Sequence, residues 1–162
     1  MEKQNKITRI LFVCMGNICR SPAAEGVLKN LVNQKSYKGY HIASCGVGDL
    51  HVGKPPDKRM QETANNRGIF LTGRAQQFEI NFFDELDYIL VSDRKVLKTL
   101  HQYAKIPEHK AKLFLMTEFC ARYKGQEVPD PYYEPEVAFD LVLDMLEDAC
   151  SGLLEHVHQV EI

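Results

Sequence analysis

A cysteine and an arginine lie close together near the start of the chain, in the loop Cys14-Met15-Gly16-Asn17-Ile18-Cys19-Arg20-Ser21-Pro22. The apolar run before this loop, residues 10–13, is typical of a buried strand, and Ser21 followed by Pro22 predicts an N-cap with proline at the first helical position. The loop therefore connects a strand to the start of a helix. Backbone N–H groups and the helix dipole favour an anion at such a place, so the loop suits phosphate.

The side chains of this loop indicate what chemistry a bound phosphate could undergo. Cys14 stands where the same N–H groups and dipole stabilise a thiolate, which is the nucleophilic form of cysteine. Arg20 can hold two phosphate oxygens with its planar guanidinium, which lysine cannot do. Gly16 can take positive φ or approach an anion closely, and Asn17 tolerates the left-handed region. The Ser21 hydroxyl is expected near the sulfur, where it can hydrogen-bond the thiolate.

A candidate acid lies far downstream, in the stretch Val128-Pro129-Asp130-Pro131-Tyr132-Tyr133. An aspartate between two prolines is usually only a turn residue. This turn follows the last predicted strand, however, so it can reach the carboxyl edge of the sheet, where open α/β folds bind their ligands. A carboxylic acid at that edge can protonate a leaving oxygen.

Strands and helices alternate along the chain and would position these residues. Apolar runs predict strands at 10–13, 40–44, 86–91 and 112–116, and helical spacing predicts helices at 21–34, 57–67, 93–103 and 138–157. The alternation predicts an α/β fold, an open four-stranded parallel sheet with helices on both faces, doubly wound and flavodoxin-like. At 162 residues, we expect a single domain over residues 1–162.

Composition excludes several classes of protein. The net charge is −2 and no basic stripe stands out, which argues against a nucleic-acid partner. The N-terminal apolar run is too short for a signal or a membrane span, so we expect no membrane partner. The five cysteines include no Cys-x-x-Cys pair, so neither a disulfide framework nor a zinc site is predicted. Reduced thiols favour a cytoplasmic protein.

The loop resembles the signature of the low-molecular-weight protein tyrosine phosphatases, Cys-x-Gly-Asn-x-Cys-Arg-Ser-Pro, and the Asp-Pro-Tyr-Tyr stretch matches the acid loop of that family. The resemblance runs from Thr8 to the final helix. It implies hydrolysis of phosphotyrosine through a phosphocysteine intermediate, with no metal or cofactor. Cys14 would be the nucleophile, Arg20 the phosphate clamp, and Asp130 the general acid and then the base. The substrate would be a phosphotyrosine protein or a small aryl phosphate, and the enzyme a monomer or weak dimer.

The resemblance implies further roles for individual residues. The phosphate-binding loop would consist of Met15, Gly16, Asn17, Ile18, Cys19 and Arg20. Asn17, Ser21 and Ser44 would form a hydrogen-bond network that supports this loop. Leu50, Tyr132 and Tyr133 would line the substrate cleft. Cys19 would trap an oxidised Cys14 as a reversible disulfide.

The chain departs from the family pattern at three positions. Leu50 stands where the family usually has an aromatic residue beside the substrate ring. Gly73 and Gln76 stand where the family has a histidine and an arginine. We therefore expect the support of the phosphate loop either to be looser or to use another residue, and the activity to be lower than is usual.

Three alternative functions share this fold or loop. Thioredoxin-coupled arsenate reductases need further cysteines after the third helix, and this chain has none between Cys45 and Cys120. Phosphoarginine phosphatases have threonine where this chain has Ile18, and the apolar side chain favours an aromatic leaving group. A silent phosphopeptide-binding module would keep the loop without turnover.

Overall fold

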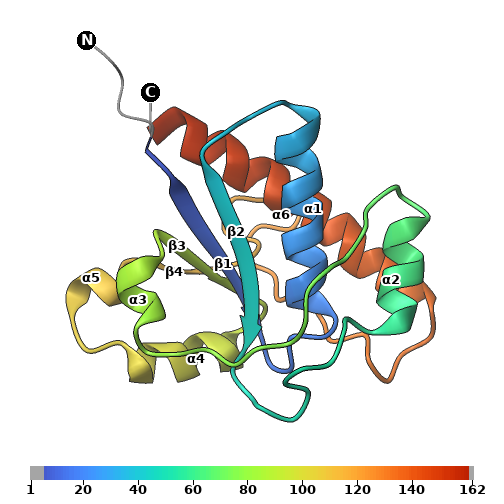
Figure 1. Cartoon of the computed structure of the whole chain (residues 1–162), viewed down its shortest axis with the longest axis horizontal. Helices are drawn as coiled ribbons and strands as arrows, with labels where there is room; N and C mark the ends of the chain where they lie inside the picture. The colour runs from blue at the N-terminus through green and yellow to red at the C-terminus, as the bar shows by residue number, and fades with distance from the viewer. Residues whose placement is uncertain (1–5, 161–162) are drawn as a thin grey trace.

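A computed structural model describes residues 6–160 and contains one four-stranded sheet between two layers of helices (Figure 1). Its strands are β1 (Thr8–Cys14), β2 (Tyr40–Gly46), β3 (Tyr88–Val91) and β4 (Leu113–Leu115). They are all parallel, in the order β2-β1-β3-β4. The predicted four-stranded parallel sheet is confirmed; the extreme ends of the predicted domain, residues 1–5 and 161–162, lie outside the described residues.

Helices cover both faces of the sheet. One layer holds α1 (Arg20–Gln34), α2 (Lys58–Asn65) and the long α6 (Val137–Val160), and the other holds α3 (Phe82–Glu85), α4 (Arg94–Tyr103) and α5 (Pro107–Lys110). The four longer helices were predicted. The one-turn helices α3 and α5 were not, because a single turn is too short to show an apolar periodicity.

Strand β1 is apolar from Ile10 to Val13 because both of its faces are buried there. Ile10 and Phe12 pack into the cluster beneath α1 and α6, whereas Leu11 and Val13 pack into the cluster with Phe83 on the opposite face. A strand covered on both faces needs apolar side chains at successive positions rather than at alternate ones. The sheet therefore holds the end of β1, and the loop that follows it, rigidly.

The start of α1 differs from the prediction. Ser21 was predicted as the N-cap, but α1 begins at Arg20 with Cys19 at the cap position, and no side chain caps it. The Ser21 hydroxyl instead contacts the Cys14 sulfur and the Asn17 amide. Pro22 is thus the third helical residue, which the first turn tolerates because the N–H there has no partner within the helix.

The strand order places the phosphate loop at the switch point of the sheet. β1 lies between β2 and β3, and α1, which connects β1 to β2, covers one face of the sheet, whereas α4, which follows β3, covers the other. Open α/β sheets form their ligand crevice at this point, outside the carboxyl ends of the strands. None of the helices within residues 6–160 is long and apolar enough to cross a membrane.

Candidate active site

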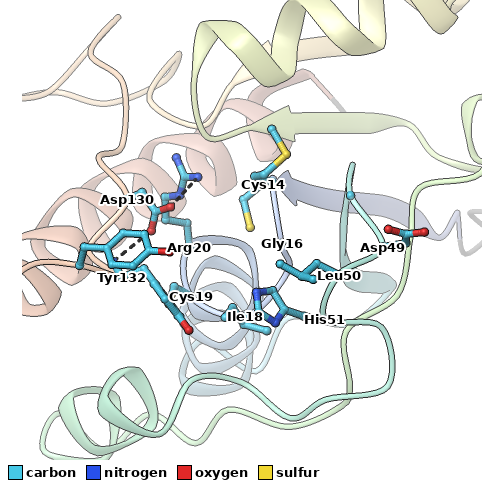
Figure 2. A pocket seen from close by; sticks show the side chains of 13 residues that line it. Cys14, Gly16, Ile18, Cys19, Arg20, Asp49, Leu50, His51, Asp130 and Tyr132 are labelled. Carbon is cyan, nitrogen blue, oxygen red and sulfur yellow. Dashed lines mark hydrogen bonds and ion pairs between the residues drawn. The ribbon is translucent and has the colours of Figure 1, made fainter.

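A cavity of about 370 Å³ opens at the carboxyl edge of the sheet (Figure 2). The predicted site residues that line it are Cys14, Met15, Gly16, Ile18, Cys19, Arg20, Leu50, Asp130, Tyr132 and Tyr133. Figure 2 shows Arg20 and Asp130 on one side of Cys14, and Leu50 and His51 on the other. The remaining predicted residues, Asn17, Ser21 and Ser44, are buried and do not line this cavity.

The Cys14 sulfur contacts two polar groups that follow it in the sequence, one backbone N–H and one hydroxyl. The Asn17 N–H donates to Sγ at 3.2 Å, and the Ser21 Oγ lies 3.0 Å from it. Asn17 takes the left-handed conformation, with φ of 57°, and Gly16 does not. Gly16 serves close approach instead, because a Cβ there would lie 3.0 Å from Cδ2 of His51.

A chain of hydrogen bonds leads from this sulfur to a carboxylate. Asn17 Nδ2 donates to Ser21 Oγ at 2.7 Å and to Ser44 Oγ at 3.0 Å, and the Ser44 hydroxyl donates to Glu25 Oε1 at 2.7 Å. A carboxylate only accepts, so the Ser44 proton points to Glu25 and both Asn17 protons point into the chain. Ser21 thus accepts from Asn17, and its one proton can go either to the Cys14 sulfur at 3.0 Å or to the Cys45 carbonyl at 3.3 Å.

Gln76 completes the hydrogen-bond network that supports the phosphate loop. We expected this support either to be looser or to use another residue, and the contacts of Gln76 agree with the second possibility. Its backbone N–H donates to Asn17 Oδ1 at 3.0 Å, and its side-chain Nε2 donates to the Ser44 carbonyl at 2.9 Å. Gly73 takes φ of 85°, and a Cβ there would have open space around it. Sequence reasoning missed Glu25, because its spacing to Lys29 looks like an ordinary surface pair.

Arg20 is buried and held by two partners on its far side. Its Nη1 donates to Asp93 Oδ2 at 2.7 Å and to the Val128 carbonyl at 3.1 Å, which leaves Nη2 facing the cavity, 3.8 Å from Asp130 Oδ2. Asp93 also caps α4 by accepting the Val96 N–H at 2.9 Å. Burial alone would raise the pKa of Asp93, but the Val96 N–H and the Arg20 guanidinium outweigh it, so this pKa is lowered.

Asp93 was predicted only as the first residue of the helix at 93–103. Its partner Arg20 lies 73 positions away in the sequence, so no local pattern could indicate the ion pair. The pair fixes the guanidinium before any ligand arrives, which is the preorganisation that a phosphate clamp needs.

Asp130 stands at the mouth of the cavity on the loop that follows β4. Its Oδ1 accepts the Tyr132 N–H at 3.1 Å, and its side chain is 54% exposed. The carboxyl group can therefore exchange protons with solvent while it faces the loop that holds Cys14.

The ring of His51 adds to the predicted tyrosines of the cleft and was not itself predicted. Leu50 was expected in place of an aromatic residue and is 80% exposed, but the next residue, His51, also lines the cavity. The centres of the His51 and Tyr132 rings are 6.2 Å apart, with 41° between their planes. The position of His51 next to Leu50 in the sequence could have indicated this, because an imidazole ring can also lie beside the ring of a substrate.

The cysteines are all free thiols in this structure. Burial raises the pKa of the Cys19 thiol well above its usual range, and the nearby carboxylates of Asp57 and Asp130 raise it further. Burial likewise raises the pKa of Cys45. The redox role of Cys19 stays a prediction. Across residues 6–160, no group of three or more histidine, cysteine or acidic side chains could hold a metal ion.

Comparisons with known proteins agree with this geometry. The family model described as low molecular weight phosphotyrosine protein phosphatase matches residues 9–161. A low molecular weight protein-tyrosine-phosphatase of Streptomyces coelicolor is 35% identical and covers 93% of this chain and 94% of its own length. The low molecular weight phosphotyrosine protein phosphatase of Gallus gallus is 34% identical, covering 94% and 98%. A crystal structure of protein tyrosine phosphatase from Entamoeba histolytica, with Hepes in the active site, has a TM-score of 0.90 at 36% identity, covering 96% and 99%. The chain belongs to the low molecular weight phosphotyrosine protein phosphatase family.

Proposed function

We propose that this protein hydrolyses phosphotyrosine, in proteins or in small aryl phosphates, through a phosphocysteine intermediate. One observation carries the proposal. The Cys14 sulfur, the Arg20 guanidinium and the Asp130 carboxyl line a single cavity, although Asp130 is distant in sequence from the other two. A nucleophile, a phosphate clamp and an acid are the groups that this reaction needs.

In the first step the Cys14 thiolate attacks phosphorus in line with the leaving oxygen. A sulfur–phosphorus bond forms as the bond between phosphorus and the phenolic oxygen breaks, and Asp130 gives its proton to that oxygen. Arg20 and the N–H groups of residues 15–20 hold the three equatorial oxygens. The Ser21 hydroxyl stabilises the thiolate from behind.

In the second step water attacks the phosphorus of the phosphocysteine. Asp130, now a carboxylate, takes the proton of the water as the new oxygen–phosphorus bond forms and the sulfur–phosphorus bond breaks. Inorganic phosphate leaves, and Cys14 returns to the thiolate. The charge stabilisation comes from Arg20 and the loop, so we propose that no metal is required.

The walls of the cavity favour an aromatic leaving group. Ile18 and Leu50 present apolar surface, and His51 and Tyr132 present rings. These side chains support aryl phosphates over alkyl phosphates and, through Ile18, over phosphoarginine. We further propose a single cytoplasmic domain that binds no nucleic acid, as the composition and free thiols suggest. That it acts as a monomer or weak dimer is proposed from the family resemblance alone.

Steady-state hydrolysis of a phosphotyrosine peptide in EDTA tests the proposal. We expect turnover in the intact protein, none with Cys14→Ser, and a fall of roughly 10²-fold or more with Asp130→Asn, because a general acid contributes typically ~10²–10⁴-fold. Asp140→Asn, which changes an exposed aspartate on α6, is the matched control and should keep full activity. If the intact protein shows no turnover in EDTA, a silent phosphopeptide-binding module becomes the better hypothesis.

A further inference from the structure

Arg59 of α2 joins the acid loop to the rest of the site. Its Nη2 donates to the Tyr132 carbonyl at 2.8 Å and to Asp57 Oδ2 at 3.1 Å, and its Nε lies 3.3 Å from Asp57 Oδ1. The carbon at the centre of the guanidinium lies 5.5 Å from the centre of the Tyr132 ring and 4.7 Å from that of Phe139. These contacts fix the plane of the guanidinium, and with it the backbone of Tyr132.

The Tyr132 backbone in turn holds the proposed acid. Its N–H donates to Asp130 Oδ1 at 3.1 Å, so the two polar groups of one residue are held by Arg59 and Asp130. The other oxygen of Asp130 has only the 3.8 Å contact with Arg20 among the contacts of the described residues. A shift of the Tyr132 backbone would therefore carry the Asp130 carboxyl with it.

Asp57, the second partner of Arg59, contacts the phosphate loop. Asp57 caps α2 by accepting the Arg59 N–H at 2.8 Å, and its own N–H donates to the Ile18 carbonyl at 2.7 Å. The phosphate loop and the acid loop thus attach to one rigid helix start. We propose that Arg59 is a positioning residue that sets the place of the Asp130 carboxyl relative to the leaving oxygen. This inference rests on the role proposed above for Asp130 as the general acid.

The effect of misplacing a general acid on the rate depends on how strongly the leaving group needs a proton. A phenolate whose phenol titrates near ~10, as tyrosine does, needs a proton as it departs. A nitrophenolate is a more stable anion and needs the acid less. Displacing Asp130 should therefore slow the cleavage of phenyl phosphate much more than that of p-nitrophenyl phosphate. Loss of general packing would slow both substrates alike.

The experiment compares kcat/KM for these two substrates in the intact protein and in Arg59→Met. Misplacement of a catalytic group by about 1 Å can lower the rate ~10²-fold. We expect a smaller loss of kcat/KM here, because Arg20 still attracts Asp130 toward its place. We expect a fall of about tenfold for phenyl phosphate and less than about threefold for p-nitrophenyl phosphate. In an Asp130→Asn background, Arg59→Met should cause no further fall, because the acid through which it acts is already gone.

Arg67→Met is the matched control. Arg67 follows α2 and pairs with Asp140 and Asp144 of α6, so its loss weakens the contact between these two helices without touching the acid loop. We expect unchanged kcat/KM for both substrates. If Arg59→Met does not fold, Arg59→Lys carries the same test, since lysine keeps the charge but cannot bond Asp57 and Tyr132 with one planar group.

The outcomes separate this inference from the proposed function. Equal losses for the two substrates, or a further loss in the Asp130→Asn background, would overturn the role of Arg59 and leave Asp130 as the acid. If Asp130→Asn itself slows both substrates equally, Asp130 is not the general acid. The roles proposed for Asp130 and Arg59 then both fall, whereas hydrolysis through Cys14 is tested separately by turnover of the intact protein in EDTA.

Discussion

Replacement of Asp93 by asparagine removes the carboxylate that neutralises Arg20 inside the fold. The new side chain keeps nearly the same size and one oxygen that can accept the Val96 N–H, so the start of α4 should survive. Its amide nitrogen would then face Arg20 Nη1, so two donors would meet. Arg20 would keep the Val128 carbonyl at 3.1 Å and the longer contact with Asp130 at 3.8 Å, but it would lose its 2.7 Å ion pair with Asp93.

The size of the effect follows from burial. The side chain of Arg20 is 6% exposed and that of Asp93 is 19% exposed. Removing one partner of a buried ion pair costs about 3–5 kcal/mol, and a hydrogen bond to a charged group is worth about 1.5–3 kcal/mol. Because Arg20 keeps one carbonyl and Asp93 is partly solvated, we expect Asp93→Asn to lower the free energy of unfolding by about 2–3 kcal/mol.

Urea unfolding measures this loss directly. A lower midpoint with an unchanged slope would show reduced stability of a protein that still unfolds in the same way. Asp140→Asn, which breaks an exposed pair with Arg67, should cost no more than about 1 kcal/mol. A loss below about 1 kcal/mol for Asp93→Asn would refute the reasoning, since Arg20 would then be stable in the fold without its charged partner.

Three further predictions concern acid stability, the phosphate loop and oxidation. Burial opposes the charged forms of Asp93 and Asp148, but backbone N–H groups, and Arg20 at Asp93, outweigh it and lower both pKa values. The stability that these two carboxylates give the folded protein should be complete above about pH 3.9, the pKa in the unfolded chain, and should disappear as the pH falls through the lower folded pKa. Urea unfolding at a series of pH values would measure this loss. Gly46→Ala places a Cβ 2.9 Å from the phosphate-loop backbone and should lower kcat/KM for an aryl phosphate by roughly 10²-fold, with KM rising as the loop moves. In Cys19→Ser, inactivation by peroxide should no longer be reversed by dithiothreitol, whereas reversal that persists would show that Cys14 does not depend on Cys19 for its protection.

The elements of the sheet could be predicted because burial on both faces leaves a strong pattern. The run of four apolar residues in β1 and the apolar stripe of α6 each reflect a long contact with the core. Element ends were less accurate: β4 was predicted at 112–116 and spans Leu113–Leu115. The predicted start of α1 was wrong. The pattern of Ser21 followed by Pro22 is typical of an N-cap, but it does not reveal that the Ser21 hydroxyl has other partners in the loop.

The site divides in the same way between local and distant contacts. Cys14 and Arg20 lie in one loop, so their motif could be recognised in the sequence. Glu25, Gln76 and Asp93 act through partners 19, 59 and 73 positions away, and each has an ordinary local interpretation as a surface pair, a loop residue or a helix cap. Only the folded sheet, which places the end of β1 between the ends of β2 and β3, brings these partners together.

This division separates the chemistry of the site from its choice of substrate. The phosphate loop depends on buried groups, since Asn17 and Arg20 each bind residues from other elements, and a change there affects both stability and catalysis. Leu50 belongs to an exposed loop and is 80% solvent-accessible, so its replacement removes little buried surface. Substitutions at Leu50 can therefore alter which aryl phosphate is preferred at little cost in folding free energy, while the geometry around phosphorus stays fixed by the core.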